Sequence, residues 1–310
     1  MKGLVFIVPF LLLAPSLPLA QDSGKISFDG YIQARWVYDS RPDKVPRTTF
    51  FIHNAAFELK ADIGKRMRAD LKITESSGNL IIEDAFLRWK PVMEADIRFG
   101  RLKMPFSREE LKAPTELVTI GRSWINGIME GMALLGRDTG VNIEISKRAV
   151  GLEFILSWGV FNGTGLISYK DIDNPKQYAG RLEISSPKGI MGVGLNGVWR
   201  REGDGMAWGI GADFSAKPFG ALCLEGEVIG GRGMGSEAFG GYLVGSCPFD
   251  KLEPFIKAEF GEGNGRRRIS ACLGLNYYLS KDLRVQGQLE GIAKGEESYL
   301  QISCQAQGRY

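Results

Sequence analysis

The chain has 310 residues, of which 44% are hydrophobic and 24% are charged, and its formal net charge is +3. This balance excludes a disordered chain, and the weak charge gives no reason to expect a nucleic-acid partner. The 41 glycines follow no collagen period. In strands, glycine permits bends, bulges and close approach of backbones, which is compatible with a single large β-domain.

Residues 1–20 have the features of a secretory signal peptide. Lys2 gives a positive start, residues 4–13 form an apolar run, and Ala20 precedes a polar stretch. A membrane anchor is the alternative, but the run is shorter than the ~20 residues that a spanning helix needs. We therefore expect cleavage near Ala20, export, and a mature chain of residues 21–310 that crosses no membrane with a helix.

From residue 25 onward, apolar and polar residues alternate in successive short segments. In the first segment, Phe28 and Trp36 share one parity, whereas Asp29 and Arg35 share the other. Side chains of a strand point alternately to its two faces, so each segment has one apolar and one polar face. This pattern is typical of transmembrane β-strands, although a soluble sandwich with a covering second sheet would produce it too.

Sixteen such segments follow one another, and bacterial outer-membrane barrels have an even number of strands. The expected strands are residues 25–38, 49–63, 67–76, 80–90, 94–104, 135–146, 150–162, 177–186, 190–200, 206–216, 220–230, 237–247, 252–261, 267–279, 283–292 and 298–310. Nearly every strand is expected to present polar residues inward. The sequence thus predicts an all-β fold, a transmembrane antiparallel β-barrel.

The connections between the expected strands alternate between tight turns and mostly longer loops. Short periplasmic turns and longer outer loops are the usual arrangement in such barrels. The outer loops are expected at residues 39–48, 76–79, 105–134, 163–176, 201–205, 231–236, 262–266 and 293–297. The third of them, residues 105–134, is the longest.

Aromatic residues of the apolar parity favour the barrel over the sandwich, because they gather near both ends of the strands. They are Trp36, Trp158, Trp199 and Trp208 near the outer loops, and Trp89, Phe214, Tyr277 and Tyr310 near the turns. Two belts of aromatic rings are typical of the two membrane interfaces. A last strand that finishes on Tyr310 also predicts recognition by the barrel assembly machinery.

Two consecutive stretches, residues 82–91 (IEDAFLRWKP) and 97–107 (IRFGRLKMPFS), resemble motifs of the phosphate-selective porin O and P family. Residues 136–141 (GRDTGV) and 161–163 (FNG) resemble later motifs, so the similarity extends over about a third of the chain. The resemblance implies a sixteen-stranded homotrimeric channel in the bacterial outer membrane, surrounded by lipid. It also implies a third outer loop that folds into the lumen and narrows it.

No catalytic set emerges from the sequence, and we expect neither enzyme activity nor a cofactor. His53 is the only histidine, so a histidine-rich metal site is impossible and a barrel hydrolase would depend on this residue. Glu225 and Glu227 share an inward parity, where solvation of a pore is a simpler interpretation than acid–base catalysis.

The informative chemistry is the charge of the inward parity and of the third outer loop. The candidate pore-lining cations are Arg35, Lys60, Arg68, Lys72, Arg88, Arg98, Arg108, Lys112, Arg122, Arg181 and Arg200. Cations in a pore favour anions, but inward carboxylates such as Asp29 and Glu58 are at least as frequent. We therefore predict a porin for passive diffusion of small hydrophilic solutes or ions, with anions such as phosphate as one class. The alternative is a structural or adhesive outer-membrane barrel with a plugged lumen.

Overall fold

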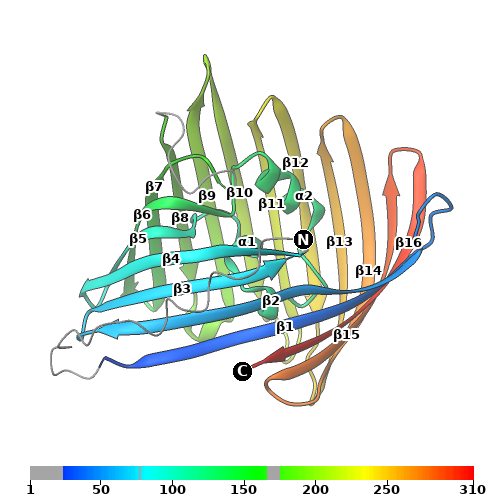
Figure 1. Cartoon of the computed structure of the whole chain (residues 1–310), viewed down its shortest axis with the longest axis horizontal. Coiled ribbons are helices and arrows are strands. Elements are labelled where there is room, and N and C mark those ends of the chain that lie inside the picture. Colours follow the sequence, from blue (N-terminus) through cyan, green and yellow to red (C-terminus); the bar gives the residue numbers. More distant parts are fainter. Residues whose placement is uncertain (1–23, 77, 166–174) are drawn as a thin grey trace, which may run out of the picture.

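The computed structural model describes residues 24–76, 78–165 and 175–310, and the expected signal peptide, residues 1–20, lies outside these ranges. Within them the chain forms one closed antiparallel barrel, because β1 pairs with both β2 and β16 (Figure 1). The strands are β1 (Ile26–Asp39), β2 (Thr48–Ile63), β3 (Met67–Ser76), β4 (Asn79–Val92), β5 (Ala95–Lys103), β6 (Arg137–Ala149), β7 (Leu152–Phe161), β8 (Gln177–Ser185), β9 (Met191–Glu202), β10 (Gly205–Ala216), β11 (Cys223–Gly233), β12 (Ser236–Ser246), β13 (Leu252–Gly263), β14 (Arg266–Tyr278), β15 (Leu283–Lys294) and β16 (Glu297–Arg309). The predicted sixteen-stranded barrel is confirmed.

The alternation of the sequence becomes the two faces of the barrel wall. In β10, Trp208, Ile210 and Phe214 are 42%, 62% and 39% exposed on the outer face, whereas Ala207 and Asp213 are buried on the inner one. An apolar face of this kind is stable only against lipid or another apolar surface. The two strand faces therefore follow directly from the period of two in the sequence.

The outer connections of β9 to β16 are shorter than the sequence predicts. The loops expected at residues 201–205, 231–236, 262–266 and 293–297 are turns of only two residues each. In one of them, Asn264 and Gly265 have φ values of 53° and 69°, as two-residue hairpin turns require. The strands continue because ladder hydrogen bonds form between backbones, whatever the polarity of the side chains at the rim.

The helices are short and belong mainly to one connection. α1 (Arg108–Leu111), a 3₁₀ turn (Pro114–Glu116) and α2 (Trp124–Gly131) all lie between β5 and β6, and a second 3₁₀ turn (Pro187–Gly189) joins β8 to β9. In the described parts of the chain, no helix is long and apolar enough to cross a membrane. We call residues 104–136 the β5–β6 connection; Figure 1 shows its helix α2 beside β12 and β13.

A hydrophobic core joins the β5–β6 connection to the inner face of the barrel wall. The connection contributes Met104, Phe106, Ile125, Met129, Met132, Leu134 and Leu135, and the wall contributes Leu102, Phe161, Ala179, Val198, Ala207, Ile229 and Ala238. Met104, Phe106 and Met129 are fully buried. Burial of this much apolar surface fixes the connection against strands β7 to β12.

Candidate functional site: the barrel lumen

Charged side chains of β1 to β6 pair across neighbouring strands on the inward face. Lys60 Nζ lies 2.8 Å from a carboxylate oxygen of Asp29, which belongs to the facing strand. Asp96 contacts the guanidinium groups of both Arg88 and Arg98. Cross-strand pairs of opposite charge stabilise a sheet modestly, and here they also leave each cation with a carboxylate beside it.

The eleven predicted pore-lining cations are distributed over both sides of the lumen. Within the described residues ten of them form ion pairs: Lys60 with Asp29, Arg68 with Asp70, Lys72 with Glu83, Arg88 and Arg98 with Asp96, Arg108 and Arg181 with Asp213, Lys112 with Glu225, Arg122 with Glu110, and Arg200 with Glu202. Arg35 instead donates two hydrogen bonds, of 3.0 and 2.7 Å, to Oε1 of Gln305.

One charged residue that sequence reasoning missed is Arg137, at the start of β6. Its guanidinium lies 2.8 Å from Asp84 and 3.1 Å from Glu83, and Glu83 also pairs with Lys72. The residue lies within the motif at residues 136–141. Arg137 has the same parity as the apolar Val141 and Ile143, so the alternation of the sequence would have placed its side chain on the outer face.

The opposite wall, formed by β9 to β13, carries glycines between its inward polar residues. A Cβ atom at Gly209 would lie 3.1 Å from Cε of Met129 and 3.2 Å from Cζ of Phe106. At Gly261 it would lie 3.0 Å from the indole ring of Trp124. Glycine leaves no mark in an apolar–polar alternation, so the sequence pattern could not reveal that this wall receives the β5–β6 connection.

Glu227 of β11 holds the first part of the β5–β6 connection. Its carboxylate accepts hydrogen bonds from Oγ of Ser107 at 3.0 Å and from the backbone amides of Arg108 at 2.9 Å and Glu109 at 3.2 Å. These amides lie at the start of α1, where no intrahelical acceptor is available to them. The side chain is 3% exposed, so the expected role in pore solvation is wrong for this residue.

The middle of the β5–β6 connection is held by inward side chains of β14 and β15. Arg284 of β15 donates to the carbonyl oxygens of Leu117 at 3.1 Å and Thr115 at 3.2 Å. Asn276 of β14 donates to the carbonyl oxygen of Val118 at 3.0 Å. The connection is therefore bonded to inward side chains of β11, β14 and β15.

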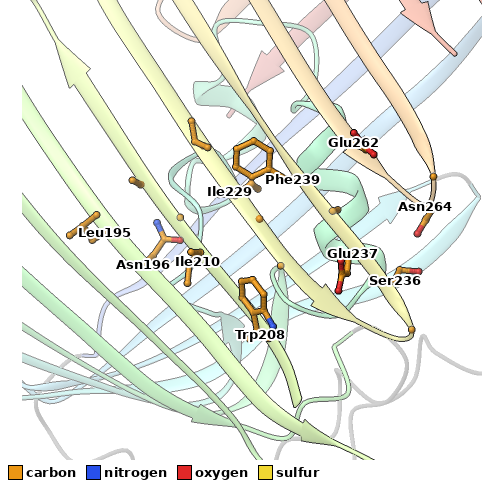
Figure 2. Close-up of a pocket in the computed structure, with 18 residues that line it drawn as sticks. Leu195, Asn196, Trp208, Ile210, Ile229, Ser236, Glu237, Phe239, Glu262 and Asn264 are labelled. Carbon is orange, nitrogen blue, oxygen red and sulfur yellow. The ribbon is translucent and has the colours of Figure 1, made fainter. Parts of the chain in front are cut away.

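A groove of about 1030 Å³ lies on the other face of the wall, over strands β9 to β13. Figure 2 shows Trp208 and Ile210 of β10 and Phe239 of β12 around it. These three side chains are exposed on the outer parity, whereas Ile229 of the same wall is 1% exposed on the inner one. The groove consequently belongs to the outer surface and takes no part in the lumen.

Comparison with known proteins settles the family. The model of the family described as phosphate-selective porin O and P matches residues 44–214, more than half of the chain. This protein belongs to the phosphate-selective porin O and P family. The porin is therefore an outer-membrane channel of bacteria, and its family and fold are those of non-enzymatic channels. A comparison with curated proteins gives no match.

Solved structures show the same fold at low sequence identity. An anion-selective porin from Comamonas acidovorans superposes with a TM-score of 0.69 at 14% identity, over 93% of this porin and 100% of that chain. OmpF of Salmonella typhi, in complex with daunomycin, gives 0.70 at 14% identity, over 94% and 99%. OmpT of Vibrio cholerae, in a trimer form, gives 0.65 at 12% identity, over 93% and 100%.

Proposed function

We propose that this porin lets small hydrophilic solutes and ions diffuse passively across the outer membrane, along the β1–β6 side of its lumen. The observation that carries the proposal is a contrast in exposure between the two walls. The side chains of the inward cations Lys60, Arg88 and Arg98 are 26%, 23% and 27% exposed on the first wall. On the other wall, the inward cations Arg200 and Lys257 are 8% and 7% exposed. In this proposal the β5–β6 connection, including the loop predicted at residues 105–134, folds into the lumen and narrows it.

Weak ion selectivity is part of the proposal, with phosphate as one permeant anion among several. Nearly every predicted pore-lining cation has a carboxylate within 4 Å, so the fields of the two charges largely cancel at the distance of a passing ion. Arg35 is the exception among these cations, because its partner, Gln305, is neutral. Its uncompensated positive charge supports a slight preference for anions.

Export, assembly and oligomeric state complete the proposal. Residues 1–20 act as a cleaved signal peptide, and the strand that ends at Tyr310 addresses the chain to the barrel assembly machinery. Outer-membrane lipid covers the apolar face of the barrel. Three copies form a homotrimer, which the similarity of the fold to a trimer form of OmpT supports.

Purified porin in a planar lipid bilayer tests the proposal. We expect ohmic conductance in KCl and a reversal potential close to zero in a salt gradient. Deletion of residues 110–130 should raise the conductance severalfold, because it removes most of the β5–β6 connection. Unchanged conductance in the deletion variant would assign the narrowing to another part of the lumen.

A structural or adhesive barrel with a plugged lumen is the second candidate. The specific observation in its favour is that the β5–β6 connection is bonded both to Glu227 of β11 and to Arg284 of β15. A complete plug predicts no conductance in the unmodified porin and a large conductance after the deletion. The bilayer measurement therefore separates the two functions directly.

A further inference from the structure

A second cavity, of about 270 Å³, lies between β1, β2, β16 and the β5–β6 connection. We call it the amide pocket, and its lining residues are Gln33, Arg35, His53, Asn54, Pro114, Leu117, Gly121, Arg122, Ser123, Asn126, Gly127, Glu130 and Gln305. Cavities that hold drug-sized ligands occupy about 300–1,000 Å³. The volume of the amide pocket therefore suits one small solute.

Carboxamide side chains from three strands and one helix meet in the amide pocket. Gln33 and Asn54 lie opposite each other on β1 and β2, and Gln305 lies opposite Arg35 across the β1–β16 ladder. Asn126 comes from α2. Each carboxamide offers both hydrogen-bond donors and an acceptor oxygen.

Three carbonyl oxygens of these carboxamides accept no hydrogen bond from the part of the chain that the structure describes. They are Oε1 of Gln33, Oδ1 of Asn54 and Oδ1 of Asn126. The orientation of Asn126 is fixed, because its Nδ2 donates to the carboxylate of Glu109 at 2.9 Å. Buried polar atoms of folded proteins nearly always have a partner, so three unpartnered acceptors around one cavity indicate a ligand that brings donors.

The charges around the amide pocket balance. Arg122 pairs with Glu110 at 3.0 Å, and the remaining lining charges are the guanidinium of Arg35 and the carboxylate of Glu130. Pro114 and Leu117 add apolar surface. A site with balanced charge, several carboxamides and an apolar patch favours a neutral solute rich in hydroxyl groups over a simple ion.

We propose that the amide pocket binds a neutral polyhydroxylated solute of monosaccharide size on its way through the lumen. Each hydroxyl group of such a solute donates one hydrogen bond to a carbonyl oxygen and accepts others from guanidinium and amide groups. The carbon skeleton of the solute packs against Pro114 and Leu117. This inference rests on the channel function proposed above and names a solute class for it.

Open-channel current of the full-length porin in a planar bilayer tests the inference, with glucose as the probe. We expect glucose to reduce the ion current saturably and to add current noise. A glucose derivative with all hydroxyl groups methylated keeps the ring but has no hydroxyl donors. It should lower the current only in proportion to concentration, as a change in viscosity does.

The matched variants are Asn54→Leu and Asn142→Leu. Asn54 lines the amide pocket, whereas Asn142 is an inward asparagine of β6 outside it. We expect N54L to raise the half-saturating glucose concentration by about two- to tenfold, the effect of one hydrogen bond. The N142L variant should match the unmodified porin.

The outcomes separate the subsite from the channel. Normal conductance without saturation by glucose would overturn the subsite and leave the channel function intact. Equal saturation by glucose and its methylated derivative, or equal shifts in N54L and N142L, would also overturn it. Saturation by inorganic phosphate but not by glucose would make the pocket an anion site. Absence of all conductance would overturn the channel function, and the subsite with it.

Discussion

The two walls of the lumen are built from the same kind of strand yet serve different purposes. The β1–β6 wall carries the inward cations Arg68, Arg88 and Arg98, whose side chains are 30%, 23% and 27% exposed. The β9–β13 wall carries Gly209 and Gly261, against which the β5–β6 connection packs. A barrel can thus anchor a segment of its own chain on one side of its lumen and leave the other side for solutes.

Substitution at Gly209 should have the largest effect on the difference between the two walls. The side chain in a Gly209→Leu variant would occupy the space of Met129 and Phe106, which lie close to the position of a Cβ atom. Displacement of the β5–β6 connection should raise single-channel conductance severalfold. A Gly287→Leu variant is the control, because a Cβ atom there meets no atom within 4 Å. Equal conductance in the two variants would show that the glycine wall does not hold the connection.

Removal of the Glu227 carboxylate should have the next largest effect. A Glu227→Ala variant leaves the amides of Arg108 and Glu109 without an acceptor, at a cost of about 1–3 kcal/mol. We expect frequent current steps to a higher conductance, because the first part of the connection is released. A Glu262→Gln variant at the outer rim should show none of these steps. Steady current in the Glu227→Ala variant would contradict the anchoring role.

Loss of a cation should shift ion selectivity more on the β1–β6 wall than on the opposite wall. An Arg98→Gln variant leaves the charge of Asp96 less compensated beside the proposed path, so the reversal potential should move by a few millivolts toward cation preference. Arg181 of the adjoining strand β8 pairs with Asp213 of the opposite wall under the connection, and an Arg181→Gln variant should shift the potential less. A larger shift in the Arg181→Gln variant would show that ions do not pass along the β1–β6 wall.

A small pH effect should arise from Glu130 at the C-terminal end of α2. Glu130 is exposed to solvent, but the barrel around it still partly desolvates the carboxylate. This desolvation first, and the negative charge of Glu110 second, raise the pKa of Glu130. Protonation at a higher pH than usual removes one negative charge from the lumen. As the pH falls from 7 to 5, the reversal potential should move slightly toward anion preference. A Glu130→Gln variant should lose that part of the shift.

Much of this fold could be predicted from the sequence, because strand and membrane impose one simple rule. The outer face must be apolar at every second residue, so Trp208, Ile210 and Phe214 mark β10 without any structural knowledge. The rule fails at the rim, where both faces are polar. There the strands extend beyond the expected ends, to turns such as Asn264–Gly265.

The organisation of the lumen could be predicted only in part. Polar parity identified inward cations such as Lys72 and Arg98 as candidates, but it could not identify their partners, which depend on strand register. Glu227 has the same sequence pattern as a solvated pore carboxylate, and only the position of α1 gives it a structural role. Side chains that meet across the lumen are far apart in the sequence, and no local pattern relates them.

Closure of the barrel by the β1–β16 ladder has a consequence for folding. Trp36 pairs with Cys304, so the ladder joins residues more than 250 positions apart. Contacts of such large sequence separation form slowly, because a long loop must be closed before they contribute. Until they form, β1 and β16 are open edges that can pair with other chains. The first and last strands are thus the part of the molecule most exposed to aggregation, and the assembly pathway must protect them longest.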